Sequence, residues 1–394
     1  MVIENLNDVL FEKCIEDILS MGKNRVFDLF DFMDIDDKIP RNILQIYLIE
    51  ILLSMEKNKF IKAKKIFKIH FLNCETYECI LNEIIRLFFK KKYLKARDII
   101  LHYLNKNPKD MYLFYVCHMI DFNFGFKDSM LKVLDVMQIK PENKFYSYYE
   151  GIKAFILSEN SIYKQSFLAA KQALKMNKKD IYALHAICHY YYYDTKKFVQ
   201  GKKLMQNQRD LWMNNYSMRL HLSWHYALFL FYTHDLENIE KIYKFLRVKN
   251  NENALEDLDA SSLAFRLKVL YNMRIDFIEA DIKALFDSWN CFKELGFYFF
   301  NDFHAALVFV LANRVDLIDV LIKKTRLSLP FGFYKHKIKI LKAIKYYHLK
   351  RYDKVIYLLD EKMDYSFMGG SRAQRNIIYE ILKQAKLNLR RVNG

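Results

Sequence analysis

Glycine and proline are scarce in this chain of 394 residues, which contains only 9 Gly and 4 Pro. An all-β protein needs many tight turns, and these two residues are among those that such turns use most. The scarcity therefore argues against an all-β fold and favours long helices joined by short corners. Apolar residues make up 52% of the chain. That share is enough for a buried core and argues against global disorder.

Paired cysteines and long apolar runs are also missing. The 6 cysteines include no Cys-x-x-Cys pair and do not form the framework of a secreted miniprotein, so a reducing compartment is expected. Apolar runs such as residues 305–312 are much shorter than the roughly 20 residues that span a bilayer. The acidic start of the chain does not resemble a secretory signal. These absences predict a cytoplasmic protein with no membrane span.

The formal charge of +17 raises the question of an anionic partner, because clustered Lys and Arg bind nucleic acid and acidic membranes. The excess is spread along the chain instead of being gathered in one block. The densest basic runs, residues 62–65 and 90–92, are expected at helix corners, where a solvated face accounts for them. Nucleic acid is therefore not the expected partner.

A short motif recurs along the chain and predicts helical hairpins. It is a polar corner that carries an aromatic residue, followed three positions later by a small or apolar residue, and its aromatic members are Phe60, Tyr93, Phe198 and Tyr352. The second helices of successive hairpins are expected to stop at polar segments that recur with a similar spacing. Pro108 and Pro141 are 33 residues apart, and Asn143 and Asn177 are 34 apart. This spacing matches the tetratricopeptide period of about 34 residues.

The predicted fold is therefore all-α, a right-handed superhelix of tetratricopeptide-like helical hairpins. We expect residues 1–394 to form a single continuous domain, with degenerate repeats over 1–180 and a candidate pocket in 181–394. Such arrays commonly bind ligands on their concave face.

Two histidine pairs are the first candidates for chemistry. His185 and His189 are four residues apart, as are His221 and His225, so each pair lies on one helix face and could chelate a transition metal. Histidines on inward helix faces are more often hydrogen-bonded packing residues. No His-Glu-x-x-His motif is present, because Ala186 stands where the first pair would need the glutamate. The sequence therefore assigns no metal and no cofactor.

Two aspartates and an arginine add polar groups to apolar segments. Asp259 is expected in the cap or first turn of a helix, and it could alternatively orient a histidine for acid–base catalysis. Asp302 and His304 are expected near a helix N-terminus, where a carboxylate is favoured. Arg266 lies on an otherwise apolar helix, and it needs a carboxylate or an anionic ligand because a buried unpaired charge is very costly.

The segment from Gly369 to Arg375 resembles an anion-binding turn, with two glycines before a helix start and basic residues in the first turns. Ser371 is expected to cap that helix. The segment lacks the Gly-Lys-Ser/Thr of a nucleotide-binding loop. Binding of phosphate or carboxylate by Ser371, Arg372, Gln374 and Arg375 is therefore an alternative to simple capping.

Five motifs in this order resemble the tetratricopeptide-repeat protein 38 family over roughly residue 180 to the end. They are His185-Ala186-Ile187-Cys188-His189, His221-Leu222-Ser223-Trp224-His225, the segment from Leu258 to Arg266, Asp302-Phe303-His304-Ala305, and Gly369-Gly370-Ser371-Arg372-Ala373-Gln374-Arg375. The resemblance implies a helical-repeat fold with no catalytic activity to transfer. The family pattern has acidic residues where this chain has Tyr191, Tyr192 and Asn376, which favours binding over catalysis.

The predicted function is binding of a peptide, a protein or a small anionic ligand in the inner groove. Trp224 would offer an apolar platform, and Arg266 and Arg372 would clamp an acidic group. The alternative is an enzyme, possibly metal-assisted, that acts on a small polar substrate. Its catalytic candidates are His185, His189, His221, His225, Asp259, Asp302 and His304.

Overall fold

The computed structural model describes residues 2–24, 27, 40–70, 76–194, 197–247, 257–290, 295–328 and 334–393, and throughout these ranges the chain is helical, with no strand. The all-α prediction is thus confirmed. Within the same ranges, no helix is both long and apolar enough to cross a membrane. Four of the six cysteines lie there, and Cys14, Cys79, Cys117 and Cys188 are free thiols. Cys74 and Cys291 fall outside the described residues.

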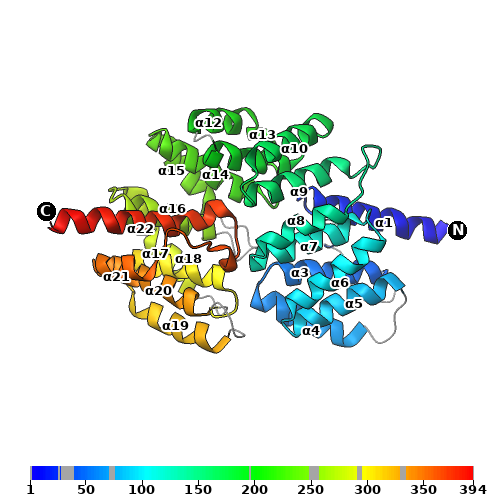
Figure 1. Ribbon diagram of the computed structural model, residues 1–394, viewed down its shortest axis with the longest axis horizontal. Helices are drawn as coiled ribbons and strands as arrows, with labels where there is room; N and C mark the ends of the chain where they lie inside the picture. Colours follow the sequence, from blue (N-terminus) through cyan, green and yellow to red (C-terminus); the bar gives the residue numbers. More distant parts are fainter. Residues whose placement is uncertain are drawn as a thin grey trace. The chain divides into compact units, whose positions relative to one another are not determined.

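The chain divides into two compact units, residues 1–222 and 223–394, and the boundary lies within helix α14 (Arg219–Tyr232). The other helices of unit 1 are α1 (Val2–Leu19), α3 (Arg41–Leu53), α4 (Lys57–His70), α5 (Thr76–Phe89), α6 (Tyr93–Lys106), α7 (Met111–Phe124), α8 (Lys127–Val136), α9 (Tyr146–Glu159), α10 (Tyr163–Met176), α11 (Ile181–His189), the π-helical η1 (Tyr190–Asp194), α12 (Phe198–Asn207) and α13 (Arg209–Met213). Figure 1 shows their order along the chain.

Unit 2 is also built from helices. It contains α15 (Leu236–Leu246), α16 (Asp257–Phe265), the π-helical η2 (Arg266–Leu270), α17 (Asp276–Asn290), α18 (Phe299–Leu311), α19 (Asp316–Ser328), α20 (Tyr334–His348), α21 (Tyr352–Leu358), the 3₁₀-helical η3 (Ser366–Met368) and α22 (Arg372–Asn393).

The helices of unit 1 recur at a constant interval. Helices α3, α5, α7, α9 and α11 begin at residues 41, 76, 111, 146 and 181, so each start lies 35 residues after the one before. Helices α3, α7 and α9 each pack against the helix that follows in sequence, which is α4, α8 and α10, respectively. Within the series, α3 also packs against α5 and α7, α7 against α9, and α9 against α11. One apolar core runs through the series, from Cys14 to Ile187.

The predicted aromatic corners fall at helix starts. Helices α6, α12 and α21 begin at Tyr93, Phe198 and Tyr352, while Phe60 is the fourth residue of α4. The small or apolar residues three positions later are inside, since Ala63, Ala96 and Val355 have no exposed surface. The motif therefore places a buried small residue where two helices pack closely.

Most of these corners turn without glycine. In the described residues, eight non-glycine residues have φ between 51 and 65°, the left-handed region. At six of them the N–H of the following residue donates to the carbonyl five residues earlier, at 2.7–2.9 Å, and these are Met21, Lys91, Ser161, His234, Asn313 and Lys350. This is the Schellman arrangement that usually employs glycine. Among the described glycines, Gly125 makes the same arrangement, with φ 71°.

Helix α18 forms the centre of unit 2. All of its residues from Phe299 to Leu311 are buried, and it packs against α16, α17, α19 and α20. The last helix, α22, packs against α16, α20, α21 and η2. Polar residues on α16, α18 and α22 are therefore enclosed by helices.

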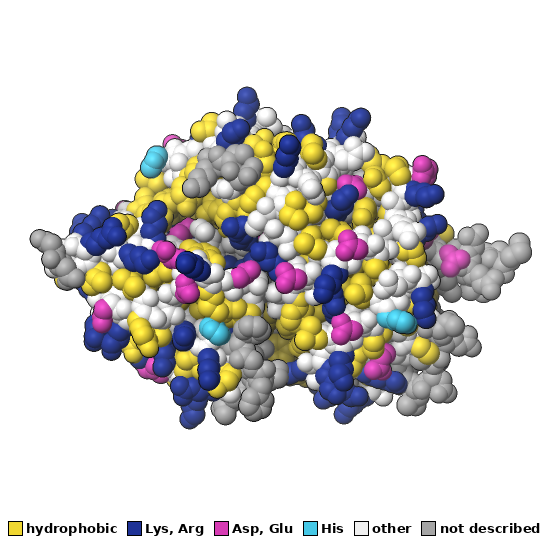
Figure 2. Space-filling model, in the orientation of Figure 1, with side chains coloured by type: hydrophobic (Ala, Val, Ile, Leu, Met, Phe, Trp, Pro, Cys, Tyr) yellow, Lys and Arg dark blue, Asp and Glu magenta, His cyan; other side chains and the backbone are white. Residues whose placement is uncertain are grey.

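Charged side chains are mixed over the surface. On the face shown in Figure 2, Lys and Arg are spread among Asp and Glu and do not form one continuous patch. This distribution agrees with the even spread of basic residues along the sequence.

Candidate functional site

The motifs singled out from the sequence are divided between the two units. His185, His189 and His221 belong to unit 1, and the remaining candidates belong to unit 2. Each group is described within its own unit. Nearly all of these side chains are buried, with His221 and Arg372 partly exposed.

In unit 1, the His185 ring contacts two other histidines, His189 and His221, each nearly perpendicular to it. The Nε2 atom of His185 lies 3.0 Å from Nε2 of His189 and 3.0 Å from Nε2 of His221. His185 and His189 share one face of α11, and the start of α14 supplies His221. His225 follows His221 by one helical turn on α14 and lies in the part of that helix that belongs to unit 2.

A carboxylate and an aromatic ring contact the histidine cluster. Glu159, the last residue of α9, places Oε1 3.6 Å from Nδ1 of His189, and both side chains are almost fully buried. Phe155 stacks on the His185 ring with centroids 4.8 Å apart and meets His189 edge-on at 5.4 Å. The π-helical η1 begins directly after His189, and such wide turns are frequent at functional sites.

In unit 2, a carboxylate of the chain itself satisfies Arg266. Its Nε donates to Glu380 Oε2 at 2.9 Å, and its Nη1 donates to the hydroxyl of Ser262. The guanidinium carbon also lies 5.6 Å from the centre of the Trp224 ring. The prediction that Arg266 needs an anionic partner is confirmed, and that partner is Glu380.

The turn before α22 is closed by reciprocal hydrogen bonds. The backbone N–H of Ser371 donates to Gln374 Oε1 at 3.0 Å, while the Gln374 N–H donates to the Ser371 hydroxyl at 3.2 Å. This is a capping box, so the predicted cap at Ser371 is confirmed. The Gln374 amide also donates to Asp259 Oδ1 at 3.0 Å. Asp259 lies in the first turn of α16, as predicted, and is joined to the start of α22.

Gly370 allows this turn to lie against α18. Its φ is 72°, and a Cβ added there would lie 2.2 Å from Cε2 of Phe300, so no side chain fits. The Gly370 carbonyl accepts a hydrogen bond from the Arg375 guanidinium. The polar groups of the predicted anion-binding turn thus contact one another, and Arg372 begins α22 with a partly exposed side chain.

Asp302 and His304 lie in α18 and both depart from their ordinary pKa values. Asp302 is in the first turn and accepts a hydrogen bond from Gly296 N–H at 2.7 Å. Burial raises the pKa of Asp302 to about 7, against the lowering effects of this bond and of Lys337. Burial lowers the pKa of His304 to about 4, and its Nδ1 contacts the Phe300 carbonyl at 2.8 Å.

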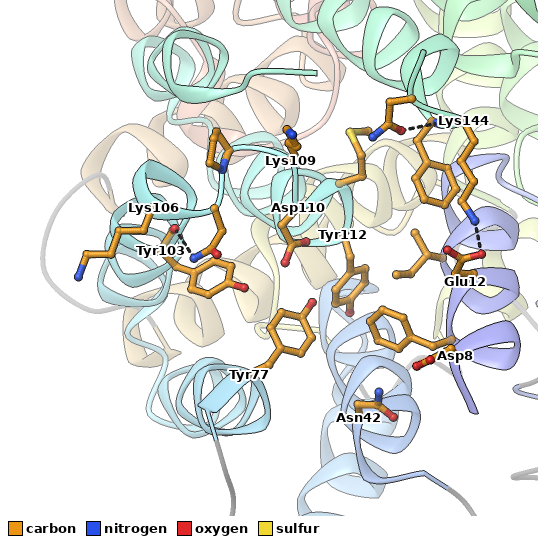
Figure 3. Close-up of a pocket in the computed structure, with 17 residues that line it drawn as sticks. Asp8, Glu12, Asn42, Tyr77, Tyr103, Lys106, Lys109, Asp110, Tyr112 and Lys144 are labelled. Carbon is orange, nitrogen blue, oxygen red and sulfur yellow. Dashed lines mark hydrogen bonds and ion pairs between the residues drawn. The ribbon is translucent and has the colours of Figure 1, made fainter. Parts of the chain in front are cut away.

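An open pocket lies elsewhere, in unit 1, and has a volume of about 960 Å³. Its walls come from α1, from the N-terminal ends of α3, α5 and α7, from the end of α6, and from the loops before α7 and α9. Figure 3 shows the rings of Tyr77, Tyr103 and Tyr112 directed toward one another around Asp110. The candidate histidines, aspartates and arginines from the sequence do not line it, whereas Pro108 and Asn143 of the recurring polar segments do.

In three asparagines of this pocket, one end of the side-chain amide makes a hydrogen bond with the backbone. Asn42 Oδ1 accepts from the Ile43 N–H at 2.8 Å, and Asn143 Oδ1 accepts from the Phe145 N–H at 2.8 Å. Asn107 donates through Nδ2 to the Tyr103 carbonyl at 3.2 Å. The opposite end of each amide offers a donor or an acceptor to a ligand.

Charges of the two signs are balanced in the same pocket. Lys144 forms an ion pair with Glu12, and Lys106 points away from the tyrosines (Figure 3). Asp110 caps α7 by accepting from the Leu113 N–H at 2.9 Å. Burial raises the pKa of Asp110, which favours its neutral form relative to an exposed aspartate.

No family model matches this chain, and no solved structure was found to match it. The sites must therefore be interpreted from their geometry.

The residues that sequence reasoning missed carry little local signal. Glu159 ends α9, which also carries Glu150, and Glu380 lies on α22 among many other polar residues, so neither is conspicuous in the sequence. Three pocket residues, Asn42, Tyr77 and Tyr112, lie at helix starts 35 residues apart, and others come from α1 and from the end of α6. The recurrence of Asn and Tyr near those starts is the signal that the sequence offers.

Proposed function

We propose that this chain is a cytoplasmic tetratricopeptide-like helical-repeat protein that binds an extended peptide segment of a partner protein. The tyrosine- and asparagine-lined pocket of unit 1 is the binding site. The observation that carries the proposal is the open pocket of about 960 Å³ at the N-terminal ends of successive helices.

The constant interval of helix starts supports the repeat class. Five starts separated by 35 residues lie close to the tetratricopeptide period of about 34. Stacked helical hairpins form a right-handed superhelix when this pattern continues, and their inner surface is used for ligands. The order of motifs after residue 180 supports membership of a tetratricopeptide-repeat protein 38-like family as part of the same proposal.

The amides of the pocket suit a peptide backbone. An extended peptide presents alternating N–H and C=O groups, and Asn42, Asn107 and Asn143 present amide donors and acceptors to match them. Tyrosine combines a large apolar ring with a polar hydroxyl, so it contributes to peptide recognition without much loss of conformational entropy. Tyr77 and Tyr103 are half-buried and have ring centroids 6.0 Å apart.

The charges favour a peptide over a small anion. Binding of a phosphate or a carboxylate needs cations without competing anions, but Lys144 is paired with Glu12. Asp8 and Asp110 also lie on the pocket wall. A peptide of mixed character fits this balanced surface better than a small anionic ligand does.

Selection from a displayed random-peptide library on the purified full chain tests the proposal. Enriched peptides, synthesised individually, should bind with measurable affinity by fluorescence anisotropy. Asn143→Ala and Tyr103→Phe should weaken that binding, because each removes hydrogen-bonding groups from the pocket. A loss of about 1 kcal/mol per hydrogen bond corresponds to roughly fivefold in affinity.

Tyr357→Phe is the matched control for Tyr103→Phe, since Tyr357 is 87% exposed and lies on α21, outside unit 1. It should leave peptide affinity unchanged. The proposal is wrong if no peptide is enriched above the library background, or if enriched peptides bind the pocket variants as tightly as the parent chain.

A further inference from the structure

We infer that the peptide pocket of unit 1 holds a basic side chain of its ligand, preferably an arginine, against Asp110 and the rings of Tyr77 and Tyr103. The inference rests on the proposed function, because it names the chemistry of one residue in the bound peptide. Three features of the pocket wall carry it: an accessible carboxylate, two tyrosine rings beside that carboxylate, and lysines that are directed elsewhere or already paired.

The carboxylate of Asp110 is held in place by uncharged donors. It accepts from the Leu113 N–H at 2.9 Å, and the Tyr112 N–H and the Tyr77 hydroxyl also donate to it. These bonds fix the position of the carboxylate but do not neutralise its charge. A cation of the ligand would therefore meet an oriented anion that is partly shielded from water, where the attraction between charges is stronger than at an open surface.

A second capping aspartate shows that the cap itself needs no opening. Asp180 caps α11 as Asp110 caps α7, and it accepts from the Ala183 N–H at 2.9 Å, two intervals of 35 residues later. Asp180 has no exposed surface, and a Cβ on Gly151 of α9 would lie 2.5 Å from its Oδ1. Asp110 is instead partly exposed and lines the pocket. Its carboxylate is therefore accessible to a ligand.

Two tyrosine rings lie next to this carboxylate. Burial and the negative charge of Asp110 both raise the pKa of Tyr77 and of Tyr103, so the three side chains are close together. The ring centroids are 6.0 Å apart, with 52° between the ring planes. One cation can therefore lie within about 6 Å of both centroids, the range over which an aromatic ring attracts a positive charge. Figure 3 shows both rings directed toward Asp110.

The lysines of the pocket wall leave this carboxylate to a ligand. Lys106 and Lys109 are exposed, and Figure 3 shows both directed away from the tyrosine rings. Lys144 is paired with Glu12. Within the part of the chain that the structure describes, no lysine or arginine forms an ion pair with Asp110. The charge beside the rings is therefore negative, although the pocket as a whole carries both signs.

Arginine suits this arrangement better than lysine does. Its planar guanidinium stacks on aromatic rings, and its five N–H groups can donate to a carboxylate and to a tyrosine hydroxyl at the same time. Lysine carries the same charge in a compact, strongly hydrated ammonium group, which loses more on leaving water. A carboxylate in the ligand would be repelled by Asp110.

Blocked amino acids test the inference without a known peptide. N-acetyl-arginine methylamide carries the cation, N-acetyl-citrulline methylamide is its uncharged isostere, and N-acetyl-glutamate methylamide carries the opposite charge. Each is titrated against the purified full chain, and saturation-transfer NMR of the small molecule gives its Kd. The arginine derivative should bind about fivefold more tightly than the citrulline derivative, and the glutamate derivative should bind more weakly than both. That ratio lies between the effects of an exposed ion pair and of a buried charged hydrogen bond.

Asp110→Asn removes the charge and keeps the cap, because asparagine caps a helix about as well as aspartate. In this variant the arginine and citrulline derivatives should bind equally. Tyr103→Leu removes one ring and should weaken arginine binding about two- to fivefold. Asp180→Asn is the matched control, since it makes the same change at the equivalent cap of unit 1, outside the pocket. It should retain the full preference for arginine.

Three results would overturn the inference. They are an arginine derivative that does not bind the parent chain, equal affinities of the parent chain for the arginine and citrulline derivatives, and an arginine preference that persists in Asp110→Asn. The first two are measured on the parent chain and do not depend on any variant folding correctly.

Failure of the proposed function is recognised separately, by the peptide selection. Enriched peptides that bind the pocket without a basic residue would leave peptide binding intact and refute the basic side chain alone. An arginine preference that depends on Asp110, found together with no enriched peptide, would support the cation site and refute peptide binding.

Discussion

Removal of Glu380 should destabilise unit 2 severely, because it deletes a carboxylate that forms an ion pair with the buried Arg266 guanidinium. Arg266 is 1% exposed, and Glu380 Oε2 is its partner at 2.9 Å. The guanidinium also contacts the Ser262 hydroxyl and the Trp224 ring, neither of which carries a charge. Breaking a buried ion pair by deleting one partner costs about 3–5 kcal/mol. Glu380→Ala should therefore lose at least this amount.

Additional losses come from the second carboxylate oxygen. Glu380 Oε1 accepts from Asn376 at 2.8 Å and from Tyr232 at 3.4 Å, and both donors lose their acceptor in the alanine variant. Each such loss adds on the order of 1 kcal/mol or less, because both residues are only partly buried. The double variant Arg266→Met plus Glu380→Leu removes both charges. It should be less destabilised than Glu380→Ala, since apolar replacement of a buried pair is often nearly neutral.

Urea unfolding followed by tryptophan fluorescence measures this difference. Trp212 lies in unit 1, so a Trp212→Phe background leaves Trp224 and Trp289 as reporters of unit 2. The midpoint of the transition should fall strongly for Glu380→Ala and recover in part for the double variant. Equal midpoints for the parent and Glu380→Ala, or a double variant less stable than Glu380→Ala, would refute the assignment of Arg266 as a buried charge that depends on Glu380.

Two further predictions concern the same unit. Gly370→Ala should destabilise unit 2 by at least about 2 kcal/mol, since φ is 72° and the new Cβ would meet Phe300; urea unfolding checks this, and an additional Phe300→Leu change should restore part of the loss. Because burial raises the pKa of Asp302 from 3.8 to about 7, the folded chain keeps a proton that the unfolded chain releases. The stability of unit 2 should therefore fall as pH rises from about 4 to about 7, and Asp302→Asn should flatten this part of the Tm–pH curve. A parent and variant with parallel curves would contradict the second prediction.

Local features of the fold were predictable from the sequence because they depend on neighbouring residues. The aromatic corners at Tyr93, Phe198 and Tyr352 mark helix starts, and Ser371 caps α22 through contacts within three residues. The period was predictable for the same reason, since it repeats a local pattern. The prediction of about 34 residues differs by one from the 35 between helix starts.

The candidate sites were predictable only in part. The i,i+4 spacing correctly predicted that His185 and His189 lie on one helix face. The high free-energy cost of burying an unpaired charge correctly predicted an anionic partner for Arg266. The partners themselves lie far away in sequence, with Glu380 114 residues after Arg266. Finding them requires knowledge of how helices pack. The peptide pocket likewise exists only where helix ends from successive hairpins come together.

The left-handed corners are positions where substitution can raise the stability of the chain. Each non-glycine residue at such a corner holds its backbone in a conformation that costs roughly 1 kcal/mol relative to glycine, partly offset by the greater freedom of glycine in the unfolded chain. Lys91 and Lys350 are exposed at these positions, and neither belongs to the histidine cluster or to the Arg266–Glu380 pair. Natural proteins rarely have the highest stability that their fold allows. In this chain, the turns are where substitutions can still raise the free energy of unfolding. Stability and ligand chemistry are therefore encoded at separate positions and can change independently.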